Sequence, residues 1–208
     1  MRTLTWYFDF ISPYAYLQST RLADFAQDIV VRCQPVLFAG LLAHHGHKGP
    51  AEIPTKRQFT YEHVAWLAQR SGIALRFPPV HPFNPLPLLR LAILLDAPMD
   101  VVVRLFRYVW VEGHLPTDAG PWQALLDELG VAPEEIEREE VKQALRDDTR
   151  AAIDAGIFGV PTCLIDGQRV WGFESTDMAM GLIAGHPFFG GEEHRAAMAV
   201  GEGVQRRV

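Results

Sequence analysis

Cysteine is scarce in this chain, which has only two among its 208 residues. Cys33 and Cys163 lie far apart in the sequence, and each falls inside an apolar segment that is typical of a strand. In a reducing compartment, cysteines in such positions are usually buried and free. We therefore expect two buried thiols and no disulfide.

Long apolar runs and clusters of basic residues are also missing. No apolar run approaches the ~20 residues of a membrane span, and Asp9 interrupts the apolar stretch near the start, unlike the pattern of a signal peptide. The formal net charge is −6, and Lys and Arg do not gather into a patch, which disfavours nucleic acid and anionic membranes as partners. We expect a cytoplasmic protein that binds neither.

The chain does contain enough apolar sequence for a sizeable core. Of its residues, 49% are hydrophobic and 21% are charged, which is the balance of a folded globular protein. A chain of this length can fold as one large domain, or as one domain that carries an insertion.

The stretch 6–17, WYFDFISPYAYL, predicts a buried strand that leads into a helix. Ser12 is a preferred N-cap residue, and Pro13 stands at the first helical position, where a missing N–H costs nothing. Beyond this turn, apolar residues recur at helical spacing as far as Phe25, whereas Gln18 falls on the polar side. We therefore expect an amphipathic helix that packs on a sheet.

One kind of chemistry can be excluded at the turn between this strand and this helix. In thioredoxin-like folds the same turn carries Cys-x-x-Cys, whose first thiol is activated by the helix N-terminus. Here Ser12 and Ala15 stand at the two cysteine positions, so thiol–disulfide exchange is impossible at this turn. The helix N-terminus still favours an anion, such as the thiolate of a ligand, and the Ser12 hydroxyl could donate a hydrogen bond to that sulfur.

The remaining elements can be placed along the chain by their periodicity and turn residues. A β-branched segment at 29–36 predicts a second strand, parallel to the first across the helix. Asp166-Gly167 predicts a tight hairpin between two further strands. Helices are expected at 60–70, 86–96, 100–113, 122–129, 133–155 and 175–184.

This order of elements predicts the fold. A β-α-β unit, a block of helices and a β-β-α unit together form an α/β thioredoxin-like fold with an inserted all-helical subdomain. We expect the thioredoxin-like domain at 1–39 and 144–185, the helical insertion at 40–143, and a loosely ordered C-terminal tail at 186–208.

Four motifs carry a resemblance to a known family. They are FDFISPY at 8–14, WVEG at 110–113, GIFGVPT at 156–162 and WGFE at 171–174. Together they resemble the 2-hydroxychromene-2-carboxylate isomerases, which are relatives of the kappa-class glutathione transferases within the DsbA-like thioredoxin superfamily. The resemblance extends over nearly the whole chain, to about residue 185.

The resemblance implies glutathione as cofactor and assigns residues to it. Ser12 matches the serine that contacts the glutathione sulfur. Val160 and Pro161 match a cis-proline turn whose preceding backbone pairs with the glutathione peptide. Lys56 matches a lysine that reaches the glycyl end of the tripeptide.

Other matches are less regular. Glu174 and Ser175 occupy the place where relatives contact the γ-glutamyl group, and Glu174 keeps a carboxylate there. His47 stands where an asparagine is expected. Asn84 and Arg90 resemble a polar pair that faces the active site, and Tyr14 could also line it.

The resemblance also implies a reaction. The family interconverts 2-hydroxychromene-2-carboxylate and trans-o-hydroxybenzylidenepyruvate, and transient addition of the thiolate would make the double bond rotatable. Glutathione would be recycled, and Lys56 or Arg90 are candidates to bind the carboxylate of a small aromatic substrate. Relatives are often dimers, so a homodimer is possible.

Two other functions remain open. A kappa-like transferase or peroxidase would conjugate or oxidise glutathione instead of returning it. A non-catalytic thioredoxin-fold binding module would have no affinity for glutathione and would be indifferent to Ser12→Ala.

Several of these residues also have simpler explanations. Ser12 could be only an N-cap, and Pro161 could be an ordinary strand-edge proline. The loop residues His44, His45 and His47 lack helical i,i+4 spacing and a carboxylate companion, so we expect no metal. Three tryptophans are expected in the core: Trp6, Trp66 and Trp110.

Overall fold

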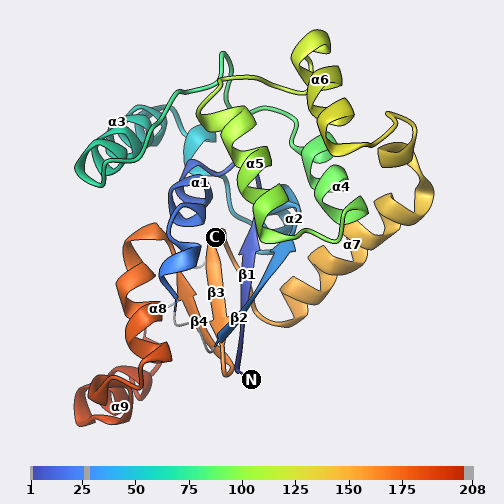
Figure 1. Cartoon of the computed structure of the whole chain (residues 1–208). Helices are drawn as coiled ribbons and strands as arrows, with labels where there is room; N and C mark the ends of the chain where they lie inside the picture. The colour runs from blue at the N-terminus through green and yellow to red at the C-terminus, as the bar shows by residue number, and fades with distance from the viewer. Residues whose placement is uncertain (1, 26–28, 204–208) are drawn as a thin grey trace.

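A four-stranded mixed sheet forms the centre of the protein (Figure 1). The computed structural model describes residues 2–25 and 29–203. The strand order is β2-β1-β3-β4, with bounds β1 (Arg2–Phe8), β2 (Ile29–Pro35), β3 (Thr162–Ile165) and β4 (Gln168–Trp171). β1 and β2 are parallel, and β3 runs antiparallel to both β1 and β4. The predicted β-α-β unit and the hairpin are both confirmed.

The second half of β1 is buried on both faces, which explains its continuous apolar sequence. Trp6 and Phe8 stack with ring centroids 4.6 Å apart, and Phe8 also packs against Phe106 from α5 (Met99–Trp110). The predicted hairpin turn has positive φ at Asp166 (48°) and Gly167 (79°), which is the geometry of a type I′ turn.

Both cysteines are buried and free, as expected. Cys33 lies in β2 and Cys163 in β3. Burial raises the pKa of each thiol to about 12, so both stay protonated and unreactive at neutral pH.

The first helix is shorter than predicted. α1 (Pro13–Ser19) begins at the expected N-cap Ser12 but ends well before Phe25, and residues Leu22–Asp24 form a separate 3₁₀ turn, η1. The hydroxyls of Ser19 and Thr20 donate to the carbonyls of Tyr16 and Leu17, at 2.6 and 2.8 Å. Such bonds compete with the helical pattern and favour an end at this point.

The prediction that Gln18 lies on the polar side of this helix is wrong. Its side chain is fully buried. Its oxygen accepts from Trp6 Nε1 at 2.8 Å, and its amide donates to Thr176 Oγ1 at 2.9 Å and to the Gly172 carbonyl at 3.1 Å. Gln18 therefore joins α1, β1 and α8 (Thr176–Ile183) through a buried polar network, which periodicity alone does not indicate.

Replacing Gln18 with leucine should lower the free energy of unfolding by about 2 to 3 kcal/mol, because the buried indole N–H of Trp6 loses its partner and the Thr176 hydroxyl keeps only its bond to the Phe173 carbonyl. Denaturant unfolding followed by tryptophan fluorescence measures this change. Gln123→Leu, on an exposed position of α6 (Ala119–Leu129), is the control, with an expected change within about 0.5 kcal/mol. Equal effects of the two variants would contradict the prediction.

The helical block comprises α2 (Phe38–His44), α3 (Pro54–Arg70), α4 (Leu86–Leu94), α5, α6 and α7 (Glu139–Asp154). Figure 1 shows α4 to α7 gathered above and beside one end of the sheet, whereas α3 lies apart from them, near the start of α1. The expected subdomain boundaries at 39/40 and 143/144 fall inside α2 and α7, and the division into subdomains stays a prediction.

The predicted continuous helix at 133–155 is wrong. Glu135–Glu137 form a 3₁₀ turn, η3, and α7 begins only after Arg138, whose ψ of 142° is extended. Glu137 pairs with Arg90 of α4 at 2.6 Å and with Lys142 at 3.0 Å. The pair with Arg90 joins the turn to α4, and the pair with Lys142 joins it to α7, so both favour the bend where a helix would continue.

Trp6 and Trp110 are fully buried, but Trp66 is 59% exposed, so its predicted core position is wrong. The reason is the peripheral place of α3, which leaves one side of that helix open (Figure 1). The expected tail contains regular structure in 186–203, namely η5 (Pro187–Gly190) and α9 (Glu192–Met198), and residues 204–208 lie outside the described part. No helix in the described ranges is long and apolar enough to cross a bilayer.

Candidate functional site

Ser12 lies at the junction of two segments that are distant in sequence. Its Oγ accepts from the Ala15 N–H at 3.2 Å, as an N-cap does. The same hydroxyl donates to the Val160 carbonyl at 3.5 Å, and the Val160-Pro161 peptide bond is cis. Ser12 and Val160 are both buried, at 7% exposure each. The structure therefore brings three of the predicted site residues together.

Side chains from the helical block hold the turn that carries Ser12. Trp110 Nε1 donates to the Phe10 carbonyl at 2.9 Å, and His81 Nε2 contacts the Ile11 carbonyl at 2.8 Å. Because a carbonyl only accepts, Nε2 of His81 carries the proton and Nδ1 accepts from the Tyr61 hydroxyl at 2.9 Å. Burial lowers the pKa of His81, which favours this neutral form. Sequence analysis missed His81, whose only signal was a lone histidine in a proline-rich arm.

Asp9 is a second residue that sequence analysis missed. It is fully buried beneath the turn, where Oδ1 accepts from the Ile11 N–H at 3.0 Å and Oδ2 from the Phe38 N–H at 2.8 Å. Its backbone carbonyl accepts from the Ser12 N–H at 3.0 Å. Burial raises the pKa of Asp9 to about 7, against the opposing effect of the backbone hydrogen bonds.

A row of three polar side chains, each near the next, lies beside the turn. Tyr14 Oη is 3.0 Å from His63 Nδ1, and His63 Nε2 is 3.5 Å from Glu174 Oε1. Burial, and then the charge of Glu174, raise the pKa of Tyr14 to about 12, so its hydroxyl stays protonated. This row of polar side chains connects α1, α3 and η4 (Phe173–Ser175). It includes two predicted site residues, whereas His63 had no signal in the sequence beyond its position on a helix.

The other predicted glutathione residues lie on the surface. His47 and Lys56 are exposed, the latter in the first turn of α3. Ser175 is half-buried and is the N-cap of α8, next to Glu174, whose side chain is 59% exposed. Exposed polar groups of this kind can meet a ligand from outside, and their roles stay predictions.

The two weaker candidates have clear structural partners. Asn84 Oδ1 accepts from the Leu86 N–H at 3.1 Å, at the start of α4. Arg90 Nη1 is bound to Glu137 Oε1 at 2.6 Å, whereas its buried Nε has no hydrogen-bond partner among the described residues. Neither contact involves the Ser12 turn, and a role for these residues in the site stays a prediction.

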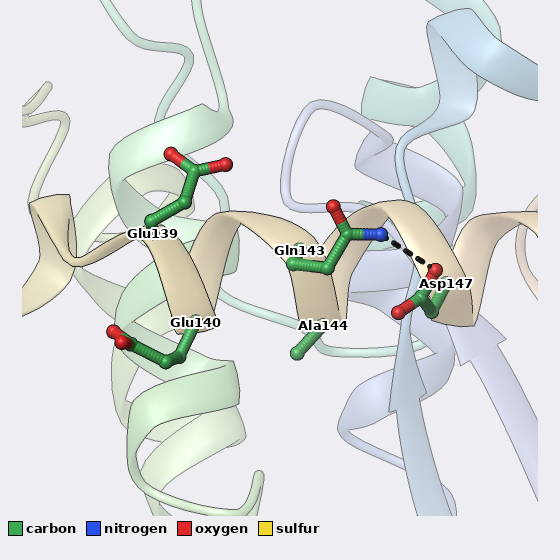
Figure 2. A pocket seen from close by; sticks show the side chains of 5 residues that line it. All are labelled: Glu139, Glu140, Gln143, Ala144 and Asp147. Atoms are coloured by element: carbon green, nitrogen blue, oxygen red, sulfur yellow. Dashed lines mark hydrogen bonds between the residues drawn. The ribbon is translucent and has the colours of Figure 1, made fainter.

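Two surface hollows lie away from these residues. One is on the outer side of α7, lined by Glu139, Glu140, Gln143, Ala144 and Asp147. Figure 2 shows that Glu139 and Glu140 point to different sides of the helix, while Gln143 donates to Asp147 at 2.8 Å. The other, of about 260 Å³, includes Arg104, which already binds Glu112 and Glu128. Neither hollow presents converging groups without partners.

Comparison with known proteins identifies the class. The family profile of the DsbA-like thioredoxin domain matches residues 3–184. The chain therefore belongs to the DsbA-like thioredoxin family, as the four-stranded sheet and the turns at Ser12 and Pro161 indicated.

Particular relatives are found within this family. The 2-hydroxychromene-2-carboxylate isomerase of Pseudomonas putida is 31% identical over 191 residues, which is 85% of this chain and 93% of the relative. Glutathione S-transferase kappa 1 of Rattus norvegicus is 26% identical over 201 residues, covering 86% of this chain and 88% of the relative. A solved 2-hydroxychromene-2-carboxylate isomerase superposes with a TM-score of 0.78 at 23% identity, covering 95% of this chain and 100% of the other, and shows the same fold. The chain is thus related to isomerases and glutathione transferases, which supports an enzyme.

Proposed function

We propose that this protein is a glutathione-dependent isomerase of conjugated aromatic carboxylates, of the 2-hydroxychromene-2-carboxylate type. The observation that carries the proposal is the position of the Ser12 hydroxyl, buried against the cis Val160-Pro161 turn. Its 3.5 Å bond to the Val160 carbonyl is at the long limit for a hydrogen bond. The hydroxyl can therefore turn toward a ligand sulfur at little cost.

The reaction follows from a thiolate held at Ser12. A free thiol of this kind has a pKa of ~8.5, and a hydrogen bond from Ser12 favours the ionised form. In the ring-closed acid the hemiketal C–O bond of the ring breaks first, and the hydroxyl proton passes to the phenol oxygen, which leaves a carbonyl conjugated to the double bond. The sulfur lone pair then forms a C–S bond to the carbon β to this carbonyl, and the double-bond electrons move to the carbonyl oxygen as an enolate. The former double bond rotates, the electrons return, and the C–S bond breaks. No net oxidation occurs, and glutathione is recovered.

Other residues would hold the two reactants. Glu174 offers a carboxylate to the γ-glutamyl ammonium, and the backbone at Val160 lies beside Ser12 to pair with the peptide. Lys56 is a candidate to bind a carboxylate, from either the glycyl end or the substrate. Arg90 is a weaker candidate because Glu137 already binds it.

An absorbance assay tests the proposal. Purified protein is mixed with 2-hydroxychromene-2-carboxylate, with and without a catalytic amount of reduced glutathione, and free thiol is titrated at the end. We expect conversion to equilibrium only with glutathione, and no loss of thiol. Absence of conversion in both conditions would refute the isomerase proposal for this substrate.

The relation to glutathione S-transferase kappa 1 supports a second candidate, a transferase. The same thiolate would then attack an electrophile such as 1-chloro-2,4-dinitrobenzene, form a C–S bond and expel chloride. One thiol would be consumed for each product formed. The thiol titration therefore separates the two candidates.

A further inference from the structure

An exposed aromatic ring lies next to the row of polar side chains formed by Tyr14, His63 and Glu174. Phe59, on α3, stacks on His63 with ring centroids 5.5 Å apart and an interplanar angle of 13°. Phe59 is nevertheless 64% exposed, so His63 covers only one face of its ring and the other is open. Trp66, two turns further along α3, is almost equally exposed at 59% but has no ring contact among the described residues.

The stack is tied to the site through the edges of the His63 ring. Nδ1 contacts Tyr14, two residues after Ser12, and Nε2 faces Glu174. The contact of Nδ1 with Tyr14 at 3.0 Å, together with the weaker approach of Nε2 to Glu174 at 3.5 Å, limits the rotation of the imidazole. The Phe59 ring lies nearly parallel to the imidazole, at an interplanar angle of 13°.

A charged residue on the same face of α3 indicates which ligand would cover the open face of the Phe59 ring. Lys56 is exposed and stands three residues before Phe59, so the two side chains are neighbours on the helix surface. An ammonium group beside an open aromatic face fits a ligand that has both a carboxylate and an aromatic ring.

We propose that the aromatic ring of the substrate stacks on the open face of Phe59, with its carboxylate toward Lys56, and that His63 is the positioning residue for Phe59. This assignment rests on the proposed function, and from it we expect the site to prefer aromatic over aliphatic conjugated acids because of Phe59.

The test uses 3-phenylpropionate, which has the ring and the carboxylate but no reactive double bond, and butyrate, which lacks the ring. Binding of each is measured by isothermal titration calorimetry with wild type, Phe59→Ala and the matched control Trp66→Ala. Phe59→Ala should raise the Kd of 3-phenylpropionate roughly 3- to 10-fold, the worth of one aromatic pair. Trp66→Ala should leave it unchanged, and neither variant should alter butyrate binding.

The positioning role of His63 is tested by comparing single and double variants of His63 and Phe59. His63→Leu should weaken 3-phenylpropionate by a similar factor, and the double variant with Phe59→Ala should be little weaker than either single one, because both act on the same ring contact. In the isomerase assay, Phe59→Ala should raise the KM of the aromatic substrate and leave kcat within about twofold.

Three results would overturn the inference: 3-phenylpropionate binding wild type no more tightly than butyrate, Phe59→Ala binding it like wild type, or Trp66→Ala weakening it equally. A change that Phe59→Ala causes only in the sedimentation coefficient would instead identify the face as a contact between copies of this chain, and would also overturn it. Ring-dependent binding without turnover would support Phe59 and refute the isomerase, so the two proposals fail separately.

Discussion

Replacing Ser12 with alanine should lower kcat/KM for glutathione-dependent isomerisation about 100-fold, which is the usual cost of removing one preorganised donor to a developing negative charge. The same change removes an N-cap, and should lower the free energy of unfolding by only about 1 kcal/mol. Activity at several glutathione concentrations and denaturant unfolding measure the two effects on one variant.

Thr20→Ala is the matched control for Ser12→Ala. Thr20 has a hydroxyl at the other end of α1, where it donates to the Leu17 carbonyl at 2.8 Å. Its loss should change stability by a similar amount and leave activity intact. If both variants lose activity in proportion to stability, Ser12 is only a cap and the catalytic role assigned to it is wrong.

Asp9 should make the protein less stable as the pH rises from about 4 to about 7. Its pKa is raised to about 7 in the fold, from an ordinary value of 3.8 in the unfolded chain. Between these values the folded state holds a proton that the unfolded chain releases, so the free energy of unfolding is greatest below about pH 4 and falls through the window. The total change is on the order of 4 kcal/mol if no other group compensates.

Urea unfolding at several pH values measures this dependence. Asp9→Asn cannot titrate, so its stability should be nearly flat over the same window, and lower than wild type at pH 5 because its amide places an N–H against a backbone donor. Asp127→Asn, at an exposed position of α6, is the control and should keep the slope of the wild type. A slope that survives in Asp9→Asn would assign the effect to another group.

Much of the fold could be predicted because its signals are local. The cap at Ser12, the Asp166-Gly167 turn and the β-branched run at 29–36 each specify their conformation through nearby residues. Gln18 could not be placed in this way, because its burial depends on Trp6 and Thr176, which only the folded sheet brings to it. The break at Arg138 depends in the same way on an ion pair to another helix.

The residues of the candidate site also differ in whether local sequence predicts them. Ser12, Pro161 and Glu174 lie in short motifs that sequence comparison recognises. His63, His81 and Asp9 act through contacts with segments far away in the chain, and a single histidine or aspartate has no local pattern to mark it. Such residues become visible only when the tertiary structure places their partners.

The backbone carbonyls of Phe10 and Ile11, which precede Ser12, determine how unfolding affects activity. Both accept from side chains of the helical block, Trp110 and His81, and so depend on that block being folded. Opening the block would break both hydrogen bonds and would release the turn at the same time. We therefore expect activity to be lost whenever the segments that carry Trp110 and His81 unfold, even where the sheet itself stays folded.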